Sequence, residues 1–190
     1  FNSALDTIAD ADEIRAGEVI RLSCVTAYPG GKGVHVAQTC GALTARQTEG
    51  PFFTPNSPLR KSLLEGKEKT RFIVTGTVLS AQCKPVPNAL LDFWHSDEEG
   101  AYDNRGFRYR GHQHADAQGR YRLETIVPAQ YPGRTRHVHV KVQAPGKRIL
   151  TTQIYFPGDP GNARDFLYRA ELEMKKVGGA EASFDFVVEA

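Results

Sequence analysis

The clearest strand pattern in this chain is His137-Val138-His139-Val140-Lys141-Val142, in which valine alternates with a polar residue. Successive side chains of a β-strand point to opposite faces, so a period of two predicts a strand with one apolar and one polar face. On that strand the two imidazoles project from the same face. The pattern therefore predicts a core strand that presents two neighbouring histidines.

Other short runs of β-forming residues are separated from this strand by turn residues such as Asp116-Ala117-Gln118-Gly119. The runs are Phe72–Leu79, Ala89–His95, Arg120–Ile126, Ile149–Phe156 and Ser183–Val188. Short strands at regular spacing, with Gly and Pro between them, are typical of a β-sandwich. We therefore expect a mainly β fold with a β-sandwich core of short antiparallel strands and long loops.

The remaining segments have weaker patterns. Residues 1–22 place Leu5, Ile8 and Ala9 at helical spacing and predict a short N-terminal helical segment. Residues 28–58 are rich in Gly, Pro and Thr and predict an irregular arm, whereas residues 163–176 predict a helix or a loop. We expect a single domain over 1–190, with the helical segment and arm over 1–58 and the β-sandwich, including the metal site, over 59–190.

The composition is that of a globular domain, with 40% hydrophobic and 24% charged residues among 190. The formal net charge of +2 is too small to indicate a nucleic-acid or anionic-membrane partner. No apolar run approaches the roughly 20 residues that a membrane span needs. Because the chain begins at Phe1 rather than Met, we expect that any targeting segment has been removed.

Three cysteines, Cys24, Cys40 and Cys83, occur without a CxxC pair, so a zinc site built on thiolates is not expected. Two interpretations stay open. Either all three are free buried thiols of a cytosolic protein, or a secreted protein has one disulfide and one free thiol. A disulfide between Cys24 and Cys40 would close the Gly-rich loop between them and stabilise it by restricting the unfolded chain.

The pair His137 and His139 is the stronger of two histidine pairs as a metal site. His112-Gln113-His114 has the same spacing, but it lies just before a turn and is interpreted as a solvated strand edge. His35 and His95 are lone histidines, to which we assign no metal role. Histidine is also a common neutral polar residue, so spacing alone leaves a structural role open for either pair.

A metal ion on His137 and His139 needs further ligands, and no cysteine or carboxylate is suitably spaced to provide them. A tyrosine phenolate is a hard, anionic donor that suits Fe(III), although the metal must drive loss of a proton whose ordinary pKa is about 10. Spacing leaves several tyrosines as candidates: Tyr102, Tyr109, Tyr121, Tyr131 and Tyr155.

A series of sequence blocks along more than half of the chain distinguishes between these candidate tyrosines. The blocks are Thr48-Glu49-Gly50-Pro51-Phe52-Phe53, Leu91-Asp92-Phe93-Trp94-His95-Ser96-Asp97, Gly100-Ala101-Tyr102, Asp116-Ala117-Gln118-Gly119-Arg120-Tyr121, Tyr131-Pro132-Gly133-Arg134-Thr135-Arg136-His137-Val138-His139 and Thr152-Gln153-Ile154-Tyr155-Phe156-Pro157-Gly158-Asp159. In these blocks and in their order, the sequence resembles the intradiol ring-cleavage dioxygenases, the family that includes catechol 1,2-dioxygenases and protocatechuate 3,4-dioxygenases.

The resemblance implies one non-haem Fe(III) held by two tyrosines and two histidines. The family's first ligating tyrosine follows a Trp and a Gly, as Tyr102 does here, and its second precedes an Arg-x-x-His-x-His run, as Tyr131 does. Tyr102 and His137 would then be equatorial ligands, and Tyr131 and His139 axial ligands. Two further residues match the family's site: Arg134 and Gln153.

The resemblance also implies the reaction. A catechol-type aromatic and O2 would be the substrates, and the ring would open between its two hydroxylated carbons to give a cis,cis-muconate-type diacid. Tyr131 would accept a substrate proton, Arg134 would stabilise developing negative charge, and Gln153 would line the site.

Departures from the family pattern modify these expectations. The long helical segment that pairs subunits in catechol 1,2-dioxygenases is reduced to residues 1–22, which predicts a monomer rather than that dimer. Gly133 stands where the protocatechuate type often has an aromatic residue, which argues against protocatechuate as the substrate. The stretch Cys40–Phe53 is similar to compact, exported members, which predicts secretion, with a cytoplasmic location as the alternative.

Two other classes of function stay open. A non-enzymatic β-sandwich module would bind carbohydrate or protein, but it has no reason to retain two tyrosines and two histidines together. A zinc hydrolase could use His137 and His139, but the block that contains them lacks a matching carboxylate or thiolate ligand.

Overall fold

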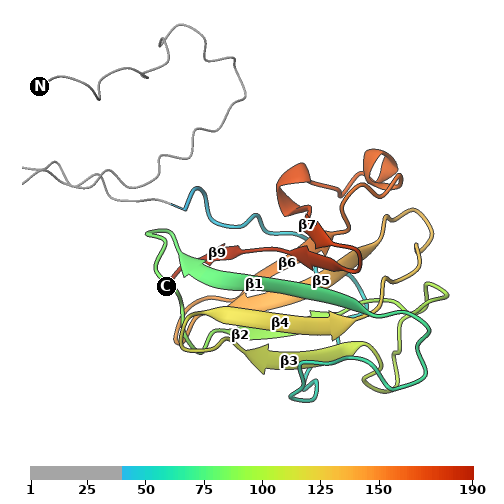
Figure 1. Ribbon diagram of the computed structural model, residues 1–190, viewed down its shortest axis with the longest axis horizontal. Helices are drawn as coiled ribbons and strands as arrows, with labels where there is room; N and C mark the ends of the chain where they lie inside the picture. The colour runs from blue at the N-terminus through green and yellow to red at the C-terminus, as the bar shows by residue number, and fades with distance from the viewer. Residues whose placement is uncertain (1–39) are drawn as a thin grey trace, which may run out of the picture. The chain divides into compact units, whose positions relative to one another are not determined.

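The computed structural model describes residues 40–190, which form two β-sheets (Figure 1). One sheet has the order β4-β1-β8-β7, with β9 also paired to β1, and the other has the order β3-β2-β5-β6. The first sheet consists of β1 (Phe72–Ser80), β4 (Arg120–Thr125), β7 (Lys175–Gly178), β8 (Glu181–Ser183) and β9 (Phe186–Val188). The second consists of β2 (Leu90–Trp94), β3 (Arg110–His114), β5 (His137–Gln143) and β6 (Leu150–Tyr155).

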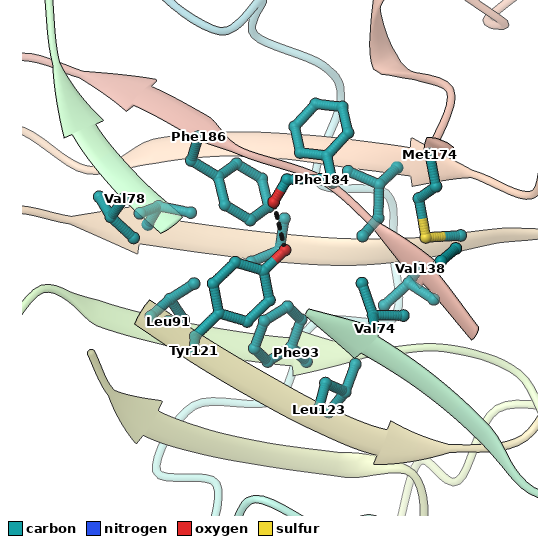
Figure 2. Close-up of a cluster of buried hydrophobic side chains, with 14 of the residues drawn as sticks. Val74, Val78, Leu91, Phe93, Tyr121, Leu123, Val138, Met174, Phe184 and Phe186 are labelled. Carbon is teal, nitrogen blue, oxygen red and sulfur yellow. Dashed lines mark hydrogen bonds between the residues drawn. The ribbon is translucent and has the colours of Figure 1, made fainter. Parts of the chain in front are cut away.

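The core lies between the two sheets, and Figure 2 shows side chains from both of them meeting there. On β5, Val138, Val140 and Val142 are each 0% exposed, as the alternating pattern predicts. Full burial of such a side chain stabilises the fold by about 1.5–3 kcal/mol. Tyr121 contributes its ring to the same core, and its hydroxyl donates a hydrogen bond to the Phe184 carbonyl oxygen at 2.8 Å. The expected mainly β sandwich is confirmed.

The strands are not all antiparallel, and here the expectation is wrong. Both β8 and β9 run parallel to β1. The run Ser183–Val188 is not one strand, because the Thr77 N–H donates to the Asp185 carboxylate at 2.8 Å rather than to a main-chain acceptor. A side chain therefore replaces one main-chain bond and divides the run in two.

The segment predicted as a helix or a loop over 163–176 contains two short 3-10 turns, Asn162–Arg164 and Ala170–Leu172, and then enters β7. The helical segment predicted over 1–22 lies outside the described residues. The expectation of a monomer and the domain division at residue 58 therefore stay predictions. In the part of the chain that the structure describes, no helix has the length and apolar character of a membrane span.

A disulfide joins Cys40 to Cys83, with their Cα atoms 4.9 Å apart. The interpretation of three free thiols is therefore wrong and the expectation of a disulfide is confirmed, but the suggested pair is wrong: Cys40 pairs with Cys83 and not with Cys24. The fold is the reason, since it places Cys40 beside the turn after β1, where its N–H donates to the Ala81 carbonyl oxygen. Cys83 is 43 positions away in sequence, so spacing could not indicate the pair.

After Cys40 the chain crosses from one sheet to the other as an arm, defined here as residues 40–58, in which the structure shows neither helix nor strand. The Thr44 N–H donates to Val187 of β9, and the Gln47 N–H donates to Thr151 of β6. Further on, Glu49 forms an ion pair with Lys141 of β5 at 2.7 Å. These contacts hold the arm over the face of β5 that is opposite to the core.

Candidate metal centre

The register of the second sheet places several polar and aromatic side chains on that covered face. His139 lies opposite Trp94 of β2 and opposite Gln153 of β6, and His137 lies opposite Tyr155. Although this face points away from the core, His137 is only 4% exposed and His139 only 3%. The arm is one reason: a Cβ added to Gly50 would lie 3.5 Å from Cε1 of His139, so the arm approaches this ring closely.

The two histidines converge on one point, as their spacing predicted. Their Nε2 atoms are 3.1 Å apart, and the Tyr102 hydroxyl lies 3.4 Å from Nε2 of His137. Nδ1 of His137 donates to the Thr135 carbonyl oxygen at 2.6 Å, which leaves a lone pair on Nε2. The His139 ring stacks on Trp94, with centroids 4.8 Å apart, and this contact fixes its plane.

Burial keeps both imidazoles neutral. It lowers the pKa of His137 to about 4, with a further contribution from the charge of Arg134. Burial also holds the pKa of His139 well below its ordinary value, and the neighbouring His137 adds to this effect. Neutral imidazole is the form that binds a metal ion, so at neutral pH these two nitrogens are ready to do so.

The two tyrosines reach the site from loops that contact each other. The Ala129 N–H donates to the Asp97 carbonyl oxygen at 2.9 Å, which joins the loop before Tyr102 to the loop before Tyr131. Gly100 has φ +85°, and a Cβ there would lie 2.7 Å from the Gln130 carbonyl oxygen, so only glycine fits between the loops. The rings of Tyr102 and Tyr131 meet edge-on at 6.3 Å.

Phe52 of the arm stacks on Tyr102, with centroids 4.4 Å apart, and contacts the edge of Tyr131. Arg110 of β3 is 2% exposed and holds Phe52 in place by donating to its carbonyl oxygen at 2.5 Å. Tyr131 is partly exposed and lines a cavity of about 490 Å³. The cavity is in the size range of small-molecule sites.

The donor set fits a hard cation. Burial raises the pKa of Tyr102 above its ordinary value, so this phenol ionises only if a positive charge drives the loss of its proton. Within residues 40–190, no group of three or more His, Cys, Asp or Glu residues is arranged to hold a metal ion. Two imidazoles with tyrosine oxygens are therefore the available ligands, and this mixture of nitrogen and anionic oxygen donors suits ferric iron.

Arg134 and Gln153 lie beside this point and contact each other. Nη2 of Arg134 donates to Oε1 of Gln153 at 2.6 Å, and Nε2 of Gln153 donates to the Thr48 carbonyl oxygen. The neighbouring Arg136, which sequence alone could not separate from Arg134, pairs instead with Asp159. The side chain of Arg134 is 10% exposed and that of Arg136 is 37% exposed.

The other histidines of the described chain make different contacts. His95 is buried, and its ring nitrogens contact the Ser96 carbonyl oxygen and the Thr125 hydroxyl. His112 contacts Ser57 of the arm, and His114 is exposed. Both lie on β3, at the end of its sheet, but the interpretation of a solvated strand edge holds only for His114, because the main chain of His112 is hydrogen-bonded to Pro58 and Arg60.

Sequence reasoning from the residues missed Phe52, Arg110 and Asp165 as parts of the site; Asp165 is the carboxylate that pairs with Nε of Arg134 at 2.9 Å. A buried arginine and a buried carboxylate are strong signals of function, but burial is not visible in the sequence. Phe52 did occur in one of the blocks that resemble the family, which was the only signal available for it.

Comparison with known proteins agrees with this geometry. A family model described as "Dioxygenase" (Dioxygenase_C) matches residues 48–189. The catechol 1,2-dioxygenase of Acinetobacter baylyi is 32% identical over 155 residues, which are 66% of this chain and 50% of that protein. The chlorocatechol 1,2-dioxygenase of a Pseudomonas species is 31% identical over 182 residues, which are 80% of this chain and 72% of that protein.

A solved structure shares both the sequence and the fold. It is the dioxygenase domain of a dioxygenase carbohydrate-binding protein fusion from Streptomyces sp. SirexAA-E, and it is 49% identical with a TM-score of 0.75. The match covers 78% of this chain and 99% of that one. The chain spans only about half the length of the A. baylyi relative, yet the family match includes both sheets and every residue of the candidate site. The chain belongs to the intradiol ring-cleavage dioxygenase family.

Proposed function

We propose that this chain is a non-haem Fe(III) dioxygenase that cleaves catechol-type aromatics between the two hydroxylated carbons to cis,cis-muconate-type diacids. The observation that supports the proposal is the convergence of Tyr102 and two neutral, buried histidines on one point, beside a cavity that Tyr131 lines. The matched catechol and chlorocatechol 1,2-dioxygenases agree with such a substrate.

The ligands proposed for the iron are Tyr102, Tyr131, His137 and His139. When bound, ferric iron would supply Lewis acidity, keeping tyrosine oxygens deprotonated and binding the two oxygens of a catechol. His137 and His139 lie two positions apart on one strand, and the Tyr102 ring is stacked on Phe52 with its hydroxyl at Nε2 of His137. Tyr131 is the proposed ligand that lines the cavity, and we propose it as the one that moves.

The chain's own residues would manage protons and charge. A catechol would lose two protons on binding, and Tyr131, which lines the cavity, would accept one of them as its phenolate. Arg134 lines the same cavity and would stabilise negative charge that develops on the substrate. Gln153 accepts a hydrogen bond from Arg134 and so would orient its guanidinium.

The proposal is tested by loading the purified protein with iron and recording its visible spectrum and its products. We expect a burgundy protein, owing to charge transfer from tyrosinate to Fe(III). Assays with catechol, hydroxyquinol and protocatechuate should yield ring-opened diacids, most slowly from protocatechuate. A colourless protein that retains zinc and no iron would contradict the proposal. Cleavage of any ring bond other than the one between the two hydroxylated carbons would also contradict it.

Tyr131→Phe is expected to keep iron but to bind substrate slowly, because the phenolate that accepts a proton is lost. A general base typically contributes about 10²–10⁴-fold to a rate, so binding should slow by at least about 10²-fold. Stopped-flow mixing of the iron-loaded variant with catechol in the absence of O2 measures this step. Binding at the parent rate would show that Tyr131 is not the proton acceptor.

We also propose that the protein functions in an oxidising compartment, outside the cytoplasm. The Cys40–Cys83 disulfide supports this, because disulfides persist in secreted proteins and are rare in the cytosol. Alkylation and mass analysis of the protein from its native source would decide the question: free thiols at both positions would contradict export.

A further inference from the structure

We propose that Asp165 is a positioning residue that holds Arg134 in the orientation required for ring cleavage. This inference rests on the proposed function, since Arg134 is assigned there to charge stabilisation. Asp165 lies directly after the 3-10 turn Asn162–Arg164. Asp165 is 31 positions from Arg134 in sequence.

The contact between the two residues is close and buried. Nε of Arg134 donates to both carboxylate oxygens of Asp165, at 3.1 and 2.9 Å. The Asp165 side chain is 1% exposed and that of Arg134 is 10% exposed. Removing one partner from such a pair leaves an uncompensated charge away from water, so the contact constrains both residues strongly.

Two anchors on one planar group fix its rotation as well as its position. The guanidinium of Arg134 is held through Nε by Asp165 and through Nη2 by Gln153. Gln153 is itself fixed, because its Nε2 donates to the Thr48 carbonyl oxygen at 2.8 Å. Because a guanidinium presents its donors in a rigid plane, these contacts determine which way its positive face points.

Asp165 also supports the chain directly after Arg134. Its carboxylate accepts from the Thr135 N–H at 2.9 Å. The carbonyl oxygen of that same Thr135 accepts from Nδ1 of His137. On the preceding side, the Arg134 N–H donates to the Tyr131 carbonyl oxygen at 2.9 Å, closing the turn that places this tyrosine.

An acid–base role for Asp165 does not fit these contacts. Although burial raises it, the pKa of Asp165 lies below its usual value, because hydrogen bonds from Thr135 N–H, Leu167 N–H and Arg134 outweigh burial. The carboxylate is therefore ionised, and both of its oxygens already accept hydrogen bonds. Asp165 lines the cavity beside Arg134, but these hydrogen bonds occupy its oxygens, so we expect it to act on a substrate through Arg134.

The test is a double-mutant cycle on iron-loaded protein with Asp165→Asn and Arg134→Gln, since Asn keeps the shape and one acceptor oxygen. We expect Asp165→Asn alone to lower kcat by about 10- to 100-fold, the scale of a misplacement near 1 Å. The KM for catechol and the iron content should stay near the parent values. In the Arg134→Gln background the same change should alter kcat by less than about twofold, because residues that act as a unit are not additive.

A matched control is Asp159→Asn. Asp159 lies in the same stretch between β6 and β7 as Asp165 and is also a buried carboxylate paired with an arginine. Its partner, Arg136, lines a different cavity, bounded by Phe72 and Phe156. We expect this variant to lose stability while kcat stays near the parent value. If Asp165→Asn lowered kcat equally with and without Arg134, or no more than Asp159→Asn does, the inference would be wrong.

A second readout does not depend on catalysis. In iron-free protein, Arg134→Gln should lower the unfolding temperature because Asp165 is left charged and buried, and adding Asp165→Asn should restore part of the loss. Additive losses would overturn the pairing. If the parent fails to cleave catechol but this coupling is present, the proposed function fails while the structural coupling stands.

Discussion

His137→Ala is expected to yield protein that purifies without stoichiometric iron, lacks the visible charge-transfer band and does not open catechol rings. The substitution removes a nitrogen 3.1 Å from Nε2 of His139 and 3.4 Å from the Tyr102 hydroxyl. Loss of a residue that merely supports a ligand typically costs about 10–100-fold in metal affinity or activity, so loss of a ligand should cost more. Iron analysis by mass spectrometry, the absorption spectrum and a catechol assay measure the three effects.

The control for this experiment is His112→Ala/His114→Ala. These histidines have the same spacing on β3, which β2 separates from β5 in the same sheet, but His112 contacts Ser57 of the arm and His114 is exposed. The double variant should retain iron and colour. Loss of iron from this variant, together with retention by His137→Ala, would show that the metal lies on β3 and that the proposed ligands are wrong.

Cys40→Ser/Cys83→Ser is expected to lower the free energy of unfolding by about 4 kcal/mol. Disulfides that close loops of about 15 and about 100 residues contribute about 3 and about 4.7 kcal/mol, and this loop is of intermediate length. The disulfide closes a loop between residues 43 positions apart. It restricts the unfolded chain and also fixes the start of the arm that covers His139. Urea unfolding of the iron-free protein, followed by circular dichroism, measures the change in stability.

The same chain provides the control. Parent protein unfolded in a reducing agent should reach the stability of the double variant, and the double variant should not respond to the reducing agent. A loss below about 1 kcal/mol would show that the arm is held by its other contacts and not by the crosslink.

The sequence predicted the sandwich well because most of its strands have a recognisable pattern of residues within the strand itself. A period of two in His137–Val142 depends only on which residues face the core, and that choice is made within the strand itself. The same logic failed for Ser183–Val188, where the Asp185 side chain accepts a main-chain hydrogen bond. It also failed for β7, because Lys175–Gly178 has no buried residue and therefore no pattern.

For the candidate site, local spacing predicted the two histidines and nothing further. Tyr102 and Tyr131 could not be separated from other tyrosines by spacing, and the family resemblance selected them. Their closeness depends on a hydrogen bond between two loops and on a glycine that fits between them. The choice between Arg134 and Arg136 depends on which carboxylate lies within reach of each, Asp165 or Asp159.

The sequence by itself therefore determined the strand that carries His137 and His139, since residues two positions apart on one strand share a face whatever the rest of the chain does. Only the tertiary structure decided that this outward face is buried, that two tyrosine rings and Arg134 lie beside it, and that Cys40 pairs with Cys83. Burial, ion pairing and crosslinking join residues far apart in sequence. The distances between such residues are set by the packing of the two sheets and their loops, and no local pattern encodes them.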